Sequence, residues 1–290
     1  MEIKVNKLSK RYRKKHALNE VSFELTEPKI YGLLGRNGAG KTTFMDILAG
    51  YQLPTSGDVL VNNKNPFDNR EISQHICLIK EGSNFNQNLK VKHILNSYSL
   101  FYPNWDQALA NELIKEYNLS LNAKVKTLSK GMESALGVIV GLSSLATITI
   151  FDEPYIGLDA AARKNFYNTL LEQYETRPRT IIFSTHLIDE VSLLFEEVLI
   201  LREGDLIMHE KAEIMRQGAF SVTGSKAEVE QFIQDKQVMK IKELANMMTA
   251  FVFGSQEGVE DTDLNVEGVP IQELMIYLTE KGGEVSWMAN

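Results

Sequence analysis

The stretch "KIYGLLGRNGAGKTTFMDILAG", residues 29–50, sets the fold that we expect for this chain. Its apolar run, Ile30 to Leu34, predicts a buried strand, and the apolar periodicity that continues to Leu48 predicts a helix. Between the two lies the pattern Gly-x-x-x-x-Gly-Lys-Thr, residues 35–42. A strand, a glycine-rich turn and a helix in this order form a phosphate-binding loop, whose backbone N–H groups surround phosphate oxygens.

The residue types of this loop suit a bound nucleoside triphosphate. Its glycines let successive N–H groups converge on phosphate, and the following helix adds its positive N-terminal end. Lys41 would bring charge to the β- and γ-phosphates, which makes it a predicted catalytic residue, and Thr42 would offer a hydroxyl to Mg²⁺. The predicted phosphate-binding residues are Gly35, Asn37, Gly38, Ala39, Gly40, Lys41, Thr42 and Thr43.

A second apolar run, in "ATITIFDEPYIGLD" (residues 146–159), ends in two adjacent carboxylates. The run predicts a buried parallel strand, and ligands of open α/β sheets lie beyond the carboxyl ends of such strands. We therefore expect Asp152 to hold Mg²⁺ through its water shell and Glu153 to polarise the attacking water. The alternative, an acidic turn that closes a strand, is disfavoured by the phosphate loop about a hundred residues upstream.

A third strand, Thr180 to Phe183 in "TIIFSTHLIDE", leads to His186. At the end of a sheet strand, the imidazole of His186 could donate to the γ-phosphate and respond to its loss. A histidine in such a turn can also be a helix cap or a core residue, and the residue alone leaves that alternative open.

Composition argues against several kinds of partner. The net charge of -7 and the pI of about 5.4 disfavour broad attraction to nucleic acid or to an anionic bilayer, so we expect no direct nucleic-acid partner. The only basic run, Lys10 to Lys15, is interpreted as a solvated turn. Cys77, the single cysteine, excludes an intrachain disulfide, and no charged-then-apolar leader follows Met1, which together indicate a cytoplasmic compartment.

One uncharged segment, residues 134–151, could be mistaken for a membrane span. Its spacing changes from helical to β-branched near Ser143 and Ser144, which predicts a helix, a turn and a buried strand. Its glycines, serines and threonines also dilute its hydrophobicity. We therefore expect no part of the chain to cross a membrane unaided.

In this order the motifs resemble the ATP-binding subunit of ABC transporters, over at least Glu2 to Arg216. "GRNGAGKTT" is similar to that family's Walker A loop, and "ITIFDEP" to Walker B with Glu153 as the catalytic glutamate. "GLD", ending at Asp159, is similar to the D-loop, and His186 to the switch histidine. Tyr12 takes the place of the aromatic residue that stacks on adenine, although the residue alone fits strand packing equally. The resemblance implies ATP and Mg²⁺ as cofactors.

The stretch "LSKGM", residues 128–132, lies where the family has its LSGGQ signature. Subunits of the family pair head to tail, so the resemblance implies that Ser129 and Gly131 face ATP held by a second ATP-binding subunit, in a homodimer or a heterodimer. Lys130 is interpreted either as added charge near the triphosphate or, preferably, as a side chain turned to solvent. Met132 replaces a glutamine and loses its amide, which predicts a weakened signature.

A second departure from the family lies in "ICLIKEGSNFNQNLKV", residues 76–91, where the family's lid glutamine aligns with Glu81 rather than with Gln87. By resemblance, Glu81 is a predicted ligand of the nucleotide and of Mg²⁺. A carboxylate can approach the cation but cannot donate hydrogen bonds as an amide does. The two departures suggest either unequal sites in a heterodimer or a slow ATPase.

The predicted fold class is α/β, a P-loop NTPase of ABC type with a parallel sheet core, an antiparallel β layer and a helical subdomain. The ATPase domain is assigned to residues 1–218 and its helical subdomain to about 85–144. Residues 2–34 suit the antiparallel layer, with Thr26 to Lys29 as a hairpin connection. Two amphipathic helices, Val91 to Tyr102 and Asp106 to Tyr117, are expected in the subdomain, the second capped by Asn104.

Residues 219–290 are interpreted as a small accessory α+β domain. Strand-like runs, "AFSVTG" and "MTAFVFG", alternate with expected helices at Lys226 to Gln234 and Ile271 to Thr279. An acidic loop, Glu257 to Glu267, contains five acids and no base. The role of this domain is not visible in the sequence.

The function implied by the resemblance is an ATP-hydrolysing motor at the cytoplasmic face of the membrane, held there by a separately encoded transmembrane subunit. Similarity to small Gram-positive peptide exporters, such as the phenol-soluble modulin exporter, suggests export of peptides or of amphipathic or antimicrobial compounds. The alternative is a non-transport ABC ATPase that acts on the ribosome or on DNA, but one motif set and no sustained heptads disfavour it. A metabolic kinase would leave the signature and His186 without a role.

Overall fold

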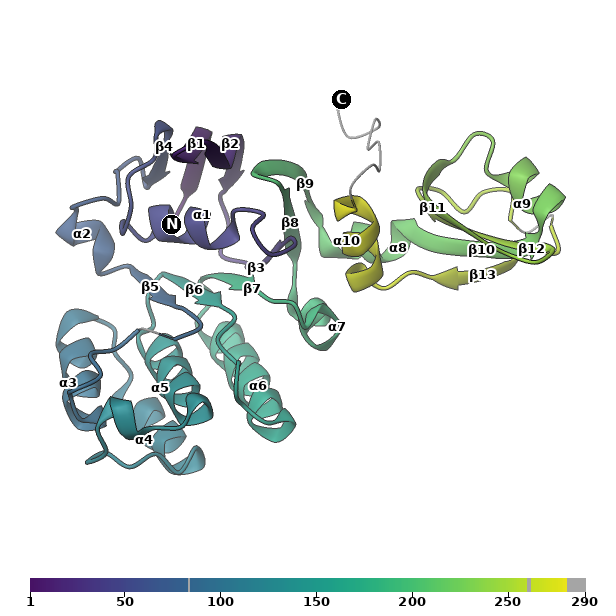
Figure 1. Cartoon of the computed structure of the whole chain (residues 1–290). Helices are drawn as coiled ribbons and strands as arrows, with labels where there is room; N and C mark the ends of the chain where they lie inside the picture. The colour runs from purple at the N-terminus through teal and green to yellow at the C-terminus, as the bar shows by residue number, and fades with distance from the viewer. Residues whose placement is uncertain (83, 260–261, 281–290) are drawn as a thin grey trace.

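The computed structural model of the chain describes residues 1–82, 84–259 and 262–280. Its centre is a six-stranded sheet in the order β5-β6-β7-β3-β8-β9, in which the first five strands are parallel and the last is antiparallel (Figure 1). The strands are β3 (Ile30–Leu34), β5 (Ile76–Ile79), β6 (Ile148–Asp152), β7 (Thr180–Ser184), β8 (Glu197–Arg202) and β9 (Asp205–Lys211). The predicted parallel sheet is confirmed, and its inner strands are buried on both faces, as unbroken apolar runs require.

An antiparallel sheet of order β2-β1-β4 covers one face of the main sheet. It consists of β1 (Ile3–Tyr12), β2 (Lys15–Leu25) and β4 (Ser56–Val61), and the sequence reading did not anticipate β4. Helix α1 (Lys41–Leu48) lies between the two sheets and contributes Phe44 and Met45 to the core that they share. The phosphate loop is thereby held between two layers of strands.

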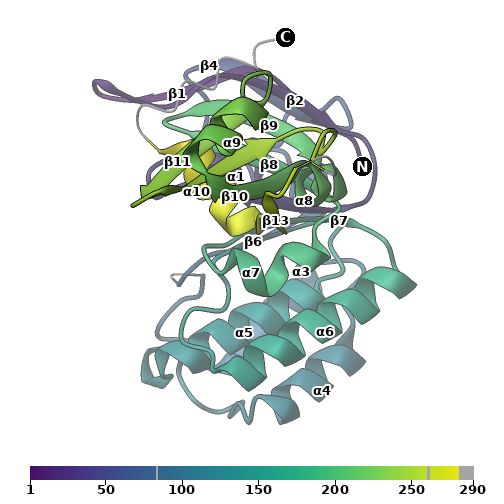
Figure 2. The same ribbon diagram turned by 90° about the vertical axis from the view of Figure 1, so that its right-hand side faces the viewer.

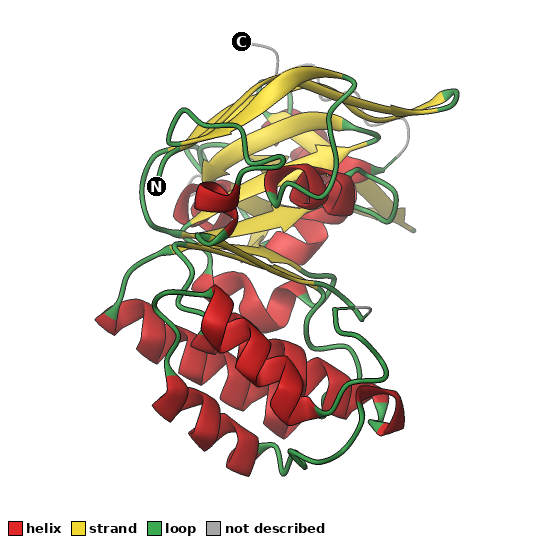
Figure 3. Ribbon diagram, turned by 90° about the vertical axis from the view of Figure 1, so that its left-hand side faces the viewer, coloured by secondary structure: helices red, strands yellow, loops and turns green. Residues whose placement is uncertain are grey.

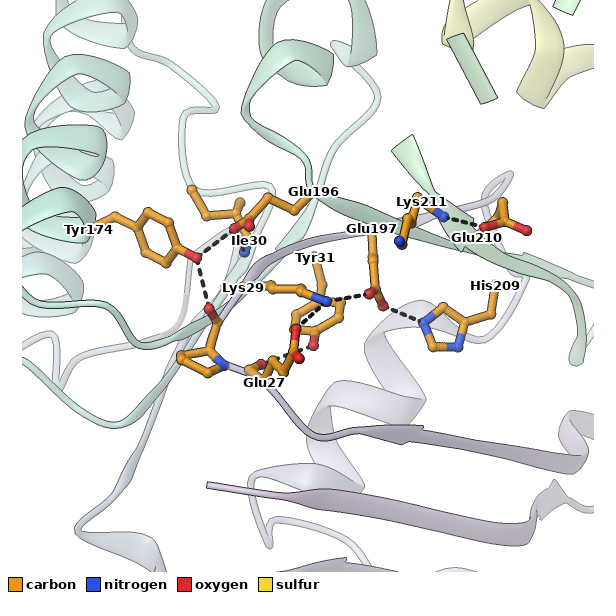
Figure 4. A network of polar contacts seen from close by, with 11 residues as sticks. Glu27, Lys29, Ile30, Tyr31, Tyr174, Glu196, Glu197, His209, Glu210 and Lys211 are labelled. Atoms are coloured by element: carbon orange, nitrogen blue, oxygen red, sulfur yellow. Dashed lines mark hydrogen bonds and ion pairs between the residues drawn. The ribbon is translucent and has the colours of Figure 1, made fainter. Parts of the chain in front are cut away.

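The prediction that Thr26 to Lys29 form a hairpin connection is wrong. This segment carries the chain from β2 in one sheet to β3 in the other, because β3 is apolar on both faces and cannot belong to a half-exposed layer. Figure 4 shows how polar contacts fix the segment: Lys29 Nζ lies 2.8 Å from Glu197 Oε1, and Tyr174 donates to the carbonyl oxygen of Pro28 at 2.8 Å.

Helices cover the other face of the main sheet (Figure 3). They are α3 (Val91–Phe101), α4 (Gln107–Glu116), α5 (Lys130–Ser143) and α6 (Ala160–Thr176), with the short α7 (Ile188–Val191) and the 3₁₀ turns Val125–Thr127 and Ser192–Leu194. The short α2 (Arg70–Ser73) lies on the opposite side, where Ile72 joins the core shared with the antiparallel sheet. Asn104 does not cap α4, contrary to expectation. Asp106 does, because it directly precedes the first turn and accepts from the N–H of Leu109 at 3.0 Å. Within the described residues, no helix combines the length and apolarity needed to cross a bilayer.

The C-terminal part follows helix α8 (Ala212–Gly218) and forms an antiparallel sheet of order β11-β12-β10-β13. Its elements are β10 (Ala219–Ser225), α9 (Lys226–Phe232), β11 (Gln237–Leu244), β12 (Met247–Phe253), β13 (Asn265–Gly268) and α10 (Ile271–Thr279). Helix α9 packs on β10 and β12 (Figure 2). Glu260 and Asp261 of the predicted acidic loop, and residues 281–290, lie outside the described residues.

Candidate functional site

A pocket of about 460 Å³ opens where the phosphate loop meets the carboxyl end of β6. It contains most of the residues that the sequence assigned to nucleotide binding. The lining residues are Tyr12, Lys15, Ala17, Asn37, Gly38, Ala39, Gly40, Lys41, Thr42, Thr43, Glu81, Asp152 and Glu153. The structure thus brings together side chains that are far apart in the sequence and that carry the chemistry of a triphosphate site.

Gly40 shows why the loop needs glycine. It is the N-cap of α1 with φ +112°, and a Cβ atom there would lie 2.3 Å from the carbonyl oxygen of Ala17. Any other residue would be strained and would push the loop away from β2. The loop therefore leads directly into the N-terminus of α1, where free backbone N–H groups favour an anion.

Lys41 is buried and its ammonium group is held inside the loop. Nζ donates to the carbonyl oxygen of Gly35 at 2.6 Å, and the side chain makes no ion pair among the described residues. Burial lowers the pKa of Lys41, and the nearby charges of Glu153 and Asp152 oppose that shift. A desolvated cation of this kind is suited to the β- and γ-phosphates of a nucleotide.

Asp152 and Thr42 form the predicted Mg²⁺ pair. Thr42 Oγ1 donates to Asp152 Oδ2 at 2.8 Å, so the two oxygens are already close enough to share one cation. Burial raises the pKa of Asp152, while the hydrogen bond from Thr42 and the charge of Lys41 act in the opposite direction. One hydroxyl and one carboxylate fit Mg²⁺, which keeps several waters and takes further oxygens from phosphate.

Glu153 lines the pocket and contacts residues at the end of β7 and in the turn that follows it. Its φ of +52° is unusual for a residue with a Cβ, and its N–H donates to the carbonyl oxygen of Ser184 at 3.1 Å. Oε2 of Glu153 lies 2.7 Å from Nδ1 of His186, so the two predicted catalytic residues are in contact. The hydroxyl of Tyr155, which the sequence analysis did not single out, donates to the same carboxylate oxygen.

Four predicted nucleotide-binding residues do not line this pocket: Gly35, at the start of the phosphate loop, and Ser129, Gly131 and Asp159. Ser129 is the N-cap of α5 and accepts from the N–H of Met132 at 3.2 Å, and Asp159 caps α6 in the same way. A Cβ atom on Gly131 would lie 2.3 Å from the carbonyl oxygen of Gly157, so the signature packs closely on the D-loop of its own subunit. The role of Ser129, Gly131 and Asp159 toward a second nucleotide stays a prediction.

The two departures from the family pattern meet in space. Nζ of Lys130 lies 3.1 Å from Oε1 of Glu81, and both side chains are exposed, at 64% and 48%. Lys130 therefore faces solvent, as the preferred interpretation has it, but it also has a carboxylate partner that the sequence did not predict. Met132 packs against the core, where its apolar side chain replaces an amide.

Tyr12 lines the pocket and is 45% exposed. Its hydroxyl bonds to Gln52, and Nζ of Lys10 lies 5.3 Å from the ring centroid. Such a placement leaves a ring face available for base stacking. The basic run forms the β1–β2 turn, as expected, and its exposed Lys15 also lines the pocket.

A phosphate loop between β3 and α1, an Asp–Glu pair ending β6 and a histidine after β7 define a P-loop ATPase site. Comparisons with known proteins agree: the family model for ABC transporters matches residues 18–156. YdbJ, an uncharacterised ABC transporter ATP-binding protein of Bacillus subtilis, is 30% identical over 272 residues, covering 91% of this chain and 83% of that protein. The chain belongs to the family of ABC transporter ATP-binding proteins, and it is an ATPase.

Two further relatives support the assignment. MJ1023, an uncharacterised ABC transporter ATP-binding protein of Methanocaldococcus jannaschii, is 34% identical over 221 residues, covering 73% of this chain and 78% of that protein. BcrA, a bacitracin transport ATP-binding protein of Bacillus licheniformis, is 32% identical over 208 residues, covering 71% of this chain and 68% of that protein.

Solved structures show the same fold. The ADP- and Pi-bound dimer of the ATP-binding cassette MJ0796 is 22% identical, with a TM-score of 0.64 over 72% of this chain and 98% of that chain. An ATP-binding subunit of an ABC transporter is 23% identical, with a TM-score of 0.67 over 75% of this chain and 92% of that chain. The predicted fold class is confirmed.

Proposed function

We propose that this chain is a motor subunit that closes head to tail with a second ATP-binding subunit on Mg-ATP and drives a separate transmembrane subunit. One observation carries the proposal: Lys41, Asp152 and Glu153 converge on one pocket beside the phosphate loop. Phosphoryl transfer to water needs a cation for the phosphates, a carboxylate that binds the metal ion and a base for the attacking water, and these three residues can supply them.

The roles within the pocket follow from these positions. Lys41 neutralises the β- and γ-phosphates, and Glu153 accepts a proton from the water that attacks the γ-phosphate. Thr42 and Asp152 would hold Mg²⁺, which when bound offsets the phosphate charge and orients the triphosphate. His186 contacts Glu153 and is placed to respond when the γ-phosphate leaves.

The dimer part of the proposal rests on residues that the pocket of this chain does not use. Ser129, Gly131 and Asp159 lie at helix N-termini outside that pocket, and the start of a helix favours an anionic ligand. In a head-to-tail pair, these residues of one subunit would close the pocket of the other. The solved MJ0796 cassette forms a dimer, which supports this arrangement.

Transport requires a membrane partner, and we propose that this chain binds one at the cytoplasmic face of the membrane. The relative BcrA is named for bacitracin transport, which supports export of peptides or of amphipathic antimicrobial compounds. The net charge of -7 is unfavourable for a nucleic-acid surface and so weighs against the ribosome- or DNA-directed alternative. Co-purification with a multi-span membrane protein would support the transport proposal, and co-purification with ribosomes or DNA would contradict it.

Replacing the proposed general base tests the hydrolytic mechanism. Glu153→Gln keeps the shape of the side chain but cannot accept the proton, so kcat should fall about 100- to 10,000-fold while ATP stays bound. Gel filtration with ATP and Mg²⁺ should then show a trapped dimer. The control is Glu172→Gln, an exposed glutamate of α6, which should hydrolyse ATP normally. A Glu153→Gln protein with the parental rate would refute the assignment.

A further inference from the structure

Tyr155 occupies a position that packing alone does not explain. It lies in the turn after β6, it is 2% exposed, and its ring stacks on Phe183 at a centroid distance of 6.3 Å. A buried phenol needs hydrogen-bond partners, and the partners of this one are Glu153, Thr185 and the N–H of His186. Two of these three are predicted catalytic residues, so the phenol joins the turns that follow β6 and β7.

The direction of each hydrogen bond around Tyr155 can be assigned. A carboxylate can only accept, so the single phenolic proton goes to Glu153 Oε2. The phenolic oxygen accepts from the N–H of His186 at 3.2 Å and from the hydroxyl of Thr185. Burial and the bond to Glu153 raise the pKa of Tyr155, so the phenol remains a donor throughout the physiological range. The phenolic hydroxyl thus donates one hydrogen bond and accepts two.

The two carboxylate oxygens of Glu153 differ in their hydrogen-bond partners. Oε2 is held by the phenol of Tyr155 and by Nδ1 of His186, whereas Oε1 accepts no hydrogen bond from the described residues. Because Glu153 lines the pocket, Oε1 is the oxygen that is left for a water molecule beside the γ-phosphate. A carboxylate fixed in one orientation avoids a reorganisation step when the reaction begins.

We propose that Tyr155 is a positioning residue for ATP hydrolysis, which holds Glu153 by Oε2 and presents Oε1 to the attacking water. This inference rests on the proposed role of Glu153 as general base. Tyr155 itself does not touch the nucleotide pocket, since it is absent from the residues that line it. Its effect should therefore fall on the chemical step rather than on ATP binding.

A second tyrosine supplies a matched control. Tyr167 is also buried and its ring lies 6.3 Å from the same Phe183, but its hydroxyl has no hydrogen-bond partner among the described residues. Tyr155→Phe and Tyr167→Phe thus remove the same atom from the same aromatic cluster. Only the first removes a hydrogen bond to Glu153.

The experiment measures ATP hydrolysis and ATP binding by the full chain with both variants. Tyr155→Phe should lower kcat about 10- to 100-fold, the size expected for one lost hydrogen bond to a charged group, with KM for ATP unchanged within about twofold. Tyr167→Phe should leave both constants at the parental values. In the Glu153→Gln background, Tyr155→Phe should cause no further loss, because Tyr155 acts through the carboxylate.

Three outcomes would overturn the proposal: a parental kcat for Tyr155→Phe, a loss of ATP binding in proportion to the loss of kcat, or a full additional loss in the Glu153→Gln background. If Tyr155→Phe does not fold, Thr185→Val can be tested instead, because it removes the hydroxyl that donates to the phenol and keeps the size of the Thr185 side chain. This variant should likewise lower kcat and leave KM for ATP unchanged. Failure of the proposed function is distinct, since Glu153→Gln itself would then retain the parental rate.

Discussion

Lys41 and Asp152 are charges that the folded chain holds away from water before any nucleotide binds. Burial lowers the pKa of Lys41 and raises that of Asp152, so the ionised form of each is less favourable in the folded chain than in the unfolded chain. Both groups therefore reduce stability near neutral pH, and bound Mg-ATP would remove that penalty. Active sites commonly sacrifice stability in this way.

The sign of the pH dependence follows for Asp152. Because its pKa is raised in the folded chain, that chain holds the proton more tightly, and stability falls as pH rises from about 3.8 to the folded-state value. Asp152→Asn keeps an oxygen for Thr42 but removes the charge. It should raise the Tm of the nucleotide-free protein at pH 7 by about 2–4 °C, or about 1 kcal/mol, and flatten the profile in that window.

Thermal unfolding with and without Mg-ATP measures this effect. The parental chain should gain stability from Mg-ATP, whereas Asp152→Asn should gain little and should not hydrolyse ATP. A variant that is less stable than the parent without nucleotide would contradict the linkage argument.

Helix α5 begins in a place where two backbone segments almost touch. Gly131 in its first turn faces the carbonyl oxygen of Gly157, and Ser129 closes the helix start by bonding to the N–H of Met132. The signature and the D-loop of one subunit are therefore in close backbone contact. The exposed pair Lys130–Glu81 adds a second connection, between the signature and the segment after β5, although an exposed ion pair contributes only about 0–1 kcal/mol.

Gly131→Ala tests this close approach. Its methyl group would lie 2.3 Å from the oxygen of Gly157, so α5 or the 155–158 turn must shift, which should lower stability by about 1–3 kcal/mol and reduce ATP hydrolysis. Urea unfolding and steady-state hydrolysis measure the two effects. Lys130→Ala is the control on the same turn, with a side chain that already points to solvent. Equal stability of the two variants would rule out the steric account.

The C-terminal part and the ATPase body share a core. Ile271 and Leu274 of α10 belong to the same cluster of buried residues as Val191 of α7, and Arg202 of β8 donates to the carbonyl oxygen of Leu278 at 3.2 Å. The chain therefore returns to the ATPase body after forming the β10–β13 sheet (Figure 1). The division at residues 218 and 219 stays a prediction, and α10 links its two sides.

We expect unfolding to report this link. Leu274 is fully buried, so Leu274→Ala should destabilise the chain by about 2–5 kcal/mol and lower the same thermal transition that ATP raises. Calorimetry with and without nucleotide measures this. Ile276→Ala, at a 40% exposed position of the same helix, should have a small effect. A lowered transition that does not respond to ATP would instead indicate an independent C-terminal domain.

Much of the fold and of the site could be read from the amino-acid sequence, because their signals are local. The phosphate loop, the Asp152–Glu153 pair and the strand before His186 are short motifs flanked by clear periodicity, and helices α9 and α10 were predicted in the same way. Strand β13 was missed because its four residues show no apolar alternation.

The features that the sequence did not predict are contacts between segments that meet only in the folded chain. The pairing of Lys130 with Glu81 joins residues 49 positions apart, and the route of residues 26–29 depends on which sheet receives β3. The contact from Tyr155 to Glu153 spans two residues, yet it requires the turn after β7 to enclose the phenol. Sequence periodicity thus identified the motifs and the elements that carry them, whereas side-chain partners arose only when separate strand ends were packed against one another.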